Sequence, residues 1–366
     1  MKSSLASLVL LIAAACVTSC GGGGDSGALE EMPARLDLVA GATTYPGDLV
    51  LAGRILVDGT ARPIVANGGV GLGNLLTNAA ALADGSVILI GQPSIWDVSL
   101  GAGEQKILRV TRHGDVTVYP GFSQTIGCGV GCVRETYVSV GGSPSGKAYV
   151  YAESSATVTV FGTSGIEAQF PLDIPRTRPD PLLGFDTYRV TPLAADANGI
   201  LYFFGKDGLM RRQHDGALQL VSADPRLERG ALAVDRAGNA YAGGRAIHKV
   251  APDGSVSLLA GSLAEAGALD ARGANARFRE ITGLAVDRDG SLYATDSFPN
   301  DAVRKITPTG DVTTAVGGLG DGRERLGDLS VARLNTLRGV AVAYPAGLWI
   351  VGRDGVLFAG VKGAAP

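Results

Sequence analysis

Two stretches of the chain, residues 231–261 and 283–317, share one pattern of apolar and polar positions. In each, apolar residues recur at every second position in four short runs, as expected where one face of a strand is buried. An Asp-x-x-Gly tetrad separates the first two runs and a Pro-x-Gly triplet separates the last two, and these are residues that tight turns favour. Each stretch therefore predicts four antiparallel β-strands.

Weaker copies of the same pattern cover most of the remaining chain. They lie at residues 82–116, 138–165, 193–216 and 339–360. Together with the two strong copies they make six units, at intervals of about forty to sixty residues, and four antiparallel strands at such a spacing are typical of a propeller blade.

The last unit ends one strand short, and residues 36–41 resemble the blade-ending residues 258–261. A strand from the other end of the domain would complete this blade and cover its edge. We therefore expect an all-β fold, a six-bladed β-propeller of four-stranded antiparallel blades whose last blade is closed by the N-terminal strand 36–41.

Three phrases in the strong copies resemble the NHL-repeat propellers of bacteria. They are Gly-Leu-Ala-Val-Asp-Arg-Asp-Gly-Ser-Leu-Tyr-Ala at 283–294, Val-Arg-Lys-Ile-Thr-Pro-Thr-Gly-Asp-Val-Thr-Thr at 303–314, and the linker-like residues 270–278. The resemblance is close over about 230–317, recognisable at 337–351 and loose before 230. It implies a propeller fold. Residues 243–245 and 297–299 replace the family's usual Asp-x-x-Asn-His loop, so no function that depends on this loop is carried over.

Composition agrees with this class of fold. The chain has 366 residues, of which 54 are Gly, and only 18% are charged, while 46% are hydrophobic. Abundant Gly among many short apolar runs is typical of a β-protein rich in tight turns.

The first twenty residues have the features of a secretory signal. Lys2 precedes the apolar run 8–15, which is too short to span a membrane, and the run leads into Val17-Thr-Ser-Cys20. This end resembles a bacterial lipobox, in which the Cys thiol receives the lipid. The alternative is an ordinary signal peptide that contains a Cys. We expect a lipoprotein signal peptide at 1–19, a lipidated Cys20 with a Gly-rich tether at 20–31, and an NHL-like propeller at 32–366.

The lipidated terminus predicts where the protein lies. Several acyl chains on Cys20 would anchor it stably to a membrane. Residue 21 is Gly rather than Asp, which, by resemblance to enterobacterial sorting, favours the outer membrane of the bacterial cell envelope. The propeller would then lie in the periplasm or at the cell surface.

Two of the four cysteines remain after export and lipidation, since Cys16 leaves with the signal. Cys128 and Cys132 form an isolated close pair separated by Gly-Val-Gly, and in an oxidising compartment such a pair predicts a local disulfide. A metal or redox pair is the alternative, but no His is near and the spacing is not Cys-x-x-Cys.

Charge argues against a nucleic-acid partner. The net charge is −3, and it becomes −4 without residues 1–19, because Lys2 is the only charged residue among them. A chain with this slightly negative charge lacks the basic surface that is typical of a nucleic-acid-binding domain. The basic residues that recur on third strands are Arg109, Arg211, Lys249 and Lys305. We expect them to pair with the turn residues Asp196, Asp235 and Asp287.

Candidate catalytic chemistry is sparse. The three His residues are His113 and His214, which sit at turns, and His248, which occupies the strand position that Arg304 fills in the next unit. Asp287-Arg-Asp289-Gly290 lacks the downstream Glu of a calcium loop, and the blade turn explains it. We therefore predict no catalytic residues, no resident cofactor and no metal ligands.

The sequence favours a non-catalytic binding or protein-interaction scaffold, anchored in the envelope through its lipid, whose partner is an envelope protein, peptide or glycan. The longest insertions, residues 91–105, the Cys128–Cys132 region and residues 170–188, are where recognition is expected. One alternative is a metal-dependent hydrolase or lyase with scattered divalent-metal ligands in the central channel. Another is a structural subunit of an envelope assembly.

Overall fold

The computed structural model describes residues 65–66, 70–71, 78–91, 103–111, 116–119, 124–126, 138–152, 155–174, 192–297, 299–318, 337–343, 347–352 and 355–360. The chain divides into two units, Met1–Pro33 and Ala34–Pro366, and every described residue belongs to the second. The described elements are β-strands and one short 3₁₀-helix, η2 (Gly273–Asn275).

The strands form antiparallel sheets in sequence order, which we number as blades. Blade 1 has β3 (Ala80–Ala81), β4 (Val87–Gly91), β5 (Gly103–Val110) and β6 (Val116–Val118), and β7 (Gln124–Ile126) also pairs with β5. Blade 2 has β8 (Val138–Gly142), β9 (Ala148–Ala152), β10 (Thr157–Gly162) and β11 (Gly165–Pro171). Blade 3 has β12 (Leu193–Ala195), β13 (Leu201–Gly205), β14 (Gly208–Arg212) and β15 (Leu218–Ser222).

The two strong copies of the sequence pattern form the next two sheets. Blade 4 has β16 (Ala231–Val234), β17 (Ala240–Gly243), β18 (Ala246–Val250) and β19 (Val256–Gly261). Blade 5 has β20 (Ile281–Val286), β21 (Leu292–Asp296), β22 (Ala302–Ile306) and β23 (Val312–Gly317). The C-terminal sheet has β24 (Gly339–Ala343), β25 (Gly347–Gly352) and β26 (Gly355–Gly360), and a separate pair is formed by β1 (Val65–Ala66) and β2 (Val70–Gly71).

These sheets confirm an all-β propeller of four-stranded antiparallel blades. Among the described residues, five sheets have four or more strands and the C-terminal sheet has three, which is one complete blade fewer than the six predicted. Residues 36–41, the predicted closing strand, lie outside the described residues.

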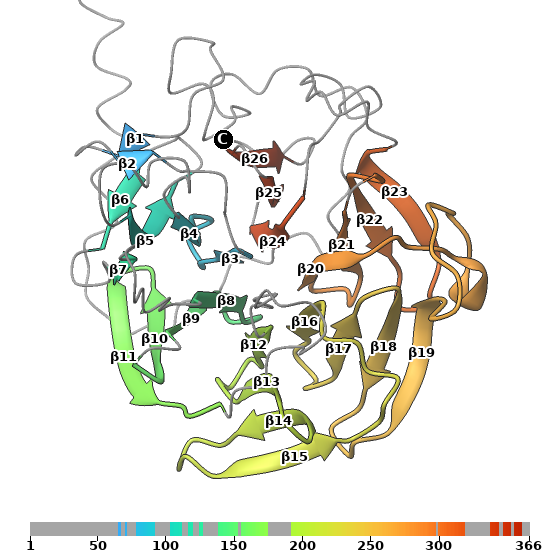
Figure 1. Cartoon of the computed structure of the whole chain (residues 1–366), viewed down its shortest axis with the longest axis horizontal. Helices are drawn as coiled ribbons and strands as arrows, with labels where there is room; N and C mark the ends of the chain where they lie inside the picture. Colours follow the sequence, from blue (N-terminus) through green and yellow to red (C-terminus); the bar gives the residue numbers. More distant parts are fainter. Residues whose placement is uncertain are drawn as a thin grey trace, which may run out of the picture. The chain divides into compact units, whose positions relative to one another are not determined.

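The first strands of the sheets surround a common centre. The strands β3, β8, β12, β16, β20 and β24 contact one another in that order, and β24 contacts β3. In Figure 1 the first strands β8, β12, β16 and β20 lie innermost, and the fourth strands β11, β15, β19 and β23 lie at the rim. Glycines allow the inner approach: a Cβ on Gly141 would lie 2.0 Å from the carbonyl oxygen of Leu193, and one on Gly283 would lie 2.7 Å from Gly339 Cα.

Among the described residues the apolar core is divided into six clusters, each shared by two neighbouring sheets. Alternation along a strand explains this division, because successive side chains point to opposite faces. On β4, for example, Val87 and Leu89 pack against the C-terminal sheet, whereas Ile88 and Ile90 pack against blade 2. Both faces of every blade are therefore apolar.

The turns predicted from the sequence form as expected. Gly199, Gly238 and Gly290 have positive φ values of 88°, 80° and 82°, and each donates its N–H to the carbonyl of the Asp three residues earlier. In one of them, Oδ1 of Asp235 also accepts the N–H groups of residues 237 and 239 at 2.9 and 2.8 Å. The recurrent Asp thus caps a tight turn, as predicted.

A β-bulge recurs between the third and fourth strands of blades 3, 4 and 5. The extra residue is Val221 in blade 3 and Leu259 in blade 4. Each presents its carbonyl oxygen to a turn glycine of the following blade: a Cβ on Gly254 would lie 2.4 Å from Val221 O, and one on Gly310 would lie 2.4 Å from Leu259 O. Neighbouring blades therefore meet through one repeated backbone contact.

Candidate functional site

Strand polarity divides the connections between two faces of the ring. The turns between first and second strands and between third and fourth strands lie on one face, which we call the turn face. The loops between second and third strands and the linkers between blades lie on the other, which we call the linker face. The described linkers are linker 3–4 (residues 223–230) and linker 4–5 (residues 262–280).

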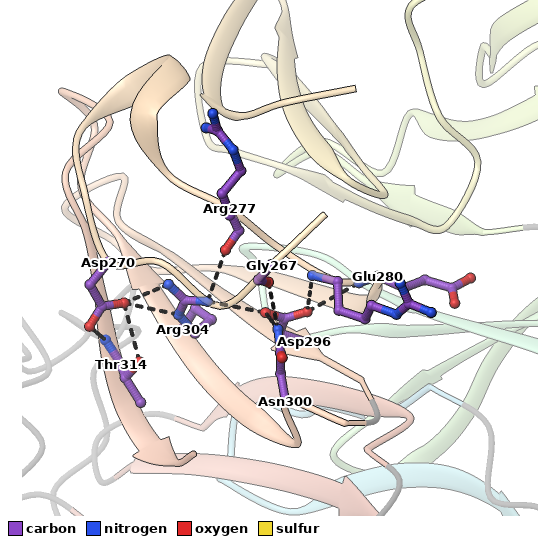
Figure 2. A network of polar contacts seen from close by, with 9 residues as sticks. Gly267, Asp270, Arg277, Glu280, Asp296, Asn300, Arg304 and Thr314 are labelled. Carbon is purple, nitrogen blue, oxygen red and sulfur yellow. Dashed lines mark hydrogen bonds and ion pairs between the residues drawn. The ribbon is translucent and has the colours of Figure 1, made fainter. Parts of the chain in front are cut away.

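A buried arginine organises the linker face of blade 5. Arg304, on β22, is only 1% exposed. Its Nε and Nη2 donate to Oδ1 of Asp270 at 3.1 and 2.5 Å, and its Nη1 donates to Oδ2 of Asp296 at 3.1 Å. Nη1 also donates to the carbonyl oxygen of Arg277 at 3.2 Å. Figure 2 shows the guanidinium between the two carboxylates. The charge of Arg304 is thus shared by a carboxylate of linker 4–5 and one at the end of β21.

Asp296 has no exposed surface, and its carboxylate is fully used. Oδ1 accepts the backbone N–H groups of Arg279 and Glu280 at 2.8 and 3.1 Å, and Oδ2 accepts Asn300 Nδ2 at 2.7 Å in addition to Arg304. Burial raises the pKa of Asp296 against the opposing effects of these hydrogen bonds and of the Arg304 charge. Four donors fill the acceptor positions of the carboxylate, which leaves none for a substrate or a metal.

Linker 4–5 follows the outer strand of blade 5 before it enters β20. Val312 donates its N–H to Ala271 O at 2.9 Å, and Thr314 donates its N–H to Oδ2 of Asp270 at 2.8 Å. Asn300 Nδ2 donates to Gly267 O at 2.7 Å, as Figure 2 shows. Phe278 is fully buried in the core between blades 4 and 5. These contacts fasten the linker, so the network around Arg304 positions the backbone rather than a reacting group.

Blade 4 has a histidine at the position of Arg304. His248 follows the same bulge on β18 that Arg304 follows on β22, which confirms the equivalence predicted from the sequence. The side chain is 2% exposed, and its Nδ1 has no hydrogen-bond partner. Burial and the charge of Arg226 lower the pKa of His248, while Asp224 and Glu228 act in the opposite direction. Burial and the Arg226 charge thus favour the neutral form of the imidazole.

A different residue supplies the carboxylate at the end of β17. Gly244 stands where Asp296 stands in blade 5, and a Cβ on Gly244 would lie 2.5 Å from Cδ of Glu228. Oε2 of Glu228 accepts the N–H groups of Arg245 and Ala246 at 2.6 and 2.9 Å. A carboxylate from linker 3–4 thus occupies the space that the strand's own carboxylate fills in blade 5.

The recurrent basic residues have varied partners. Arg109 forms an ion pair with Asp84 and donates to Thr163 O at 2.8 Å. Arg211 donates to Gln219 at 3.1 Å, and Lys305 lies 5.6 Å from the ring centre of Tyr293. The sequence therefore located these residues on third strands but did not identify these partners.

The inner strands offer little catalytic chemistry. Apart from Ser139 and Thr282, the described first strands β3, β8, β12, β16, β20 and β24 carry only apolar residues and glycine. Within the described ranges, no group of three or more His, Cys, Asp or Glu side chains has the geometry of a metal site. The strands around the centre thus contribute no carboxylate, imidazole or thiol.

The other predicted sites have limited structural description. His214 lies in an exposed turn on the turn face, as expected. Cys20, Cys128, Cys132 and His113 lie outside the described residues, and so do most of the insertions 91–105 and 170–188. Across the part of the chain that is described, no helix is long and apolar enough to cross a membrane.

The strand ends that flank the long insertions nevertheless lie on one face. The segment 92–102 joins the second strand of blade 1 to its third, and segments 127–137 and 175–191 join blade 1 to blade 2 and blade 2 to blade 3. All three therefore begin and end at the linker face. The turn face carries short glycine turns in every described case.

Comparison with known proteins supports the fold and not a family. No protein family matches the chain, and no curated protein matches it. A structure from Bacteroides thetaiotaomicron VPI-5482, a protein of unknown function, is similar with a TM-score of 0.59 at 16% identity, covering 82% of this chain and 73% of that one. An auxiliary nutrient binding protein from Bacteroides ovatus ATCC 8483 is similar with a TM-score of 0.51 at 16% identity, covering 82% and 76%. Membership of the NHL family stays a prediction.

Proposed function

We propose that this protein is a lipoprotein of the bacterial cell envelope, acylated at Cys20, whose propeller binds a ligand without catalysis through its linker face. The ligand class is an envelope protein, a peptide or a glycan. No nucleic acid and no resident cofactor take part.

The observation that carries this proposal is the difference between the two faces of the ring. Every described connection on the turn face is a short turn closed by a glycine with positive φ. The linker face receives linker 4–5 with its nineteen residues, 262–280, and the strand ends of all three long insertions. A rigid ring that gathers its long connections on one side is a common arrangement for recognition.

The chemistry of the described groups supports binding over catalysis. The buried carboxylate of Asp296 has its acceptor positions filled, and the first strands contribute neither carboxylates nor imidazoles around the centre. General acid–base or metal-assisted chemistry needs such groups with positions left for substrate. The description of one similar structure as a nutrient binding protein agrees with a binding role.

The proposal includes the parts of the chain that complete the ring. The cyclic contacts of six first strands and the three strands of the C-terminal sheet support a six-bladed ring in which residues 36–41 supply the missing strand. Cys128 and Cys132 would form a disulfide in the linker between blades 1 and 2, and so would shape a loop of the linker face.

Anchoring is tested in cells fed an alkyne analogue of palmitate. The full chain should incorporate the label and fractionate with membranes, whereas Cys20→Ser should lose the label and leave the membrane fraction. Cys16→Ser is the matched control, because Cys16 would leave with the signal, and it should behave as wild type. Label that persists in Cys20→Ser would disprove acylation at this residue.

The binding face is tested by photocrosslinking in the producing cells. A photoreactive residue is placed at Lys206, Arg245 or Arg279, exposed on the linker face, or at His214, Arg236 or Asp253, exposed on the turn face. We expect discrete adducts from the linker-face set only. Adducts confined to the turn face would contradict the proposed binding face.

The absence of catalysis is tested by metal removal. A stoichiometric metal in the purified chain, whose removal by EDTA abolishes hydrolase or lyase activity, would contradict the non-catalytic function.

A further inference from the structure

Linker 3–4 packs on the face of blade 4 that carries a buried histidine, because Leu227 lies in one apolar cluster with Ala242, the strand neighbour of His248. Linker 4–5 contacts a buried arginine in blade 5. The two side chains, His248 and Arg304, hold the same place in their blades, and both are at most 2% exposed. Arg304 is permanently charged and is satisfied by Asp270 and Asp296. Only the histidine can change its charge between about pH 5 and 8.

The charged groups that act on the pKa of His248 are already engaged with other partners. Asp224 forms an ion pair with Arg226 at 2.5 Å, and Glu228 accepts the two N–H groups at the start of β18. The strand neighbours of His248 are Ala242 on β17 and Leu258 on β19, which carry no charge. None of the hydrogen bonds of Asp224, Arg226 or Glu228 reaches the imidazole.

We propose that linker 3–4 is a proton-operated latch: it lies closed over neutral His248, and protonation of His248 releases it. In the closed state an imidazolium would have a buried Nδ1–H without an acceptor, and the charge of Arg226 would oppose its formation. A buried charged donor without a partner is costly. Release removes this cost, because water can then solvate the imidazolium, or Asp224 can exchange Arg226 for it.

The direction of the pH dependence follows from the two states. Burial and Arg226 lower the pKa of His248 in the closed state, whereas in the released state its pKa returns towards about 6.5. The closed state is therefore fully favoured above pH about 6.5, and it is progressively lost as the pH falls from there through the lower pKa of the closed state.

The latch belongs to the linker face. Arg226 has an exposed side chain in linker 3–4, and Arg245 is exposed beside the N–H groups that Glu228 holds. Release would alter how both residues are presented. This consequence for ligand binding rests on the proposed function, but the latch itself does not.

The experiment measures amide hydrogen exchange of the full chain, without ligand, at about pH 7.5 and about pH 5.5, on either side of the ordinary histidine pKa. After correction for intrinsic exchange rates, opening of residues 223–230 should increase towards acid by up to about tenfold per pH unit, the limit for one coupled proton. Linker 4–5, held by the permanently charged Arg304, serves as an internal control and should change less over this range.

Two variants assign the effect to His248. His248→Gln should remove the pH dependence of linker 3–4, and His214→Gln, which changes an exposed turn, should retain it. In addition, histidine-selective NMR of the wild-type chain, which has three His residues, should show the His248 resonance titrating below its ordinary pKa. An unchanged acid response in His248→Gln, equal acid responses of the two linkers, or a His248 pKa at or above the ordinary value would each overturn the latch. Because no ligand or membrane is involved, these outcomes are independent of the proposed function.

Discussion

Blades 4 and 5 share their backbone and differ in the polar contacts that hold their linkers. Both have the same arrangement of four strands, the same bulge and a large buried apolar side chain from the linker, Leu227 or Phe278. In blade 5 an arginine joins two carboxylates, whereas in blade 4 a buried histidine takes its place, and Asp224 and Arg226 of the linker pair with each other. The repeat thus specifies strands and turns, and the junctions between blades are free to differ.

The difference also shows what each buried group requires. A guanidinium remains charged at every physiological pH and must bring its own counterions into the protein, which Asp270 and Asp296 provide. An imidazole can be buried neutral at lower cost, and its Nδ1 can then be left without a partner. The junction at Arg304 should therefore be less sensitive to moderate acid than the junction at His248.

The largest effect is expected from removing the arginine. Arg304→Leu leaves the buried carboxylate of Asp296 without its cation, and breaking one side of a buried ion pair costs about 3–5 kcal/mol. Urea unfolding of the full chain should show this loss, together with faster hydrogen exchange in linker 4–5.

The double variant Arg304→Leu/Asp296→Asn separates charge from packing. Asn keeps an oxygen for the two backbone N–H groups but carries no charge, so the double variant should be more stable than Arg304→Leu alone. If the two variants were equally unstable, the cost would lie in lost packing and not in an uncompensated charge.

A smaller effect is expected at the end of β17. Gly244→Ala places a Cβ 2.5 Å from Cδ of Glu228, and overpacking of this kind typically costs about 1–3 kcal/mol. The free energy of unfolding should fall accordingly. In a Glu228→Gly background the same substitution should cost much less, because Cδ and Cβ of Glu228, which lie 2.5 and 2.6 Å from the added Cβ, are then both absent. Equal costs in the two backgrounds would show that Glu228 does not occupy the position that Asp296 fills in blade 5.

The smallest effect is expected at the exposed ion pair between Asp224 and Arg226 in linker 3–4. The charge of Arg226 lowers the pKa of His248, so Arg226→Gln should raise the pKa of this histidine and move the acid opening of linker 3–4 to higher pH. Histidine-selective NMR measures the pKa directly. Arg236→Gln, an exposed arginine on the turn face, is the control. A fall in the pKa of His248 in Arg226→Gln would contradict the proposed arrangement.

The strands and turns could be predicted from the sequence because their signals are local. Alternating apolar residues and an Asp three positions before a Gly determine a hairpin within about ten residues. The equivalence of His248 with Arg304 was predicted for the same reason, since both occupy one position in a repeated strand.

The polar contacts at the junctions could not be predicted from the sequence. The interacting residues are distant in the chain, or a residue of the linker takes the role that a strand residue has in the other blade. Arg304 reaches Asp270, which lies in a linker thirty-four residues earlier. At the other junction a glutamate from the linker takes the place of a strand aspartate, with a glycine opposite it to make room. The change at residues 243–245 and 297–299 was visible as a departure from the family pattern, but its meaning depends on side chains that only the fold brings together.

The repeated contact between a bulge carbonyl and the glycine of the next blade has a consequence for how such a chain can evolve. Gly254 contacts Val221 in the same way as Gly310 contacts Leu259. Each blade carries both its own bulge and its own turn glycine, so a tandem duplication of one blade supplies both sides of the new contact at once. The copied blade meets its neighbours through a surface that already exists. Ring size can then change by recombination within a gene, while the linkers diverge afterwards to suit each new position.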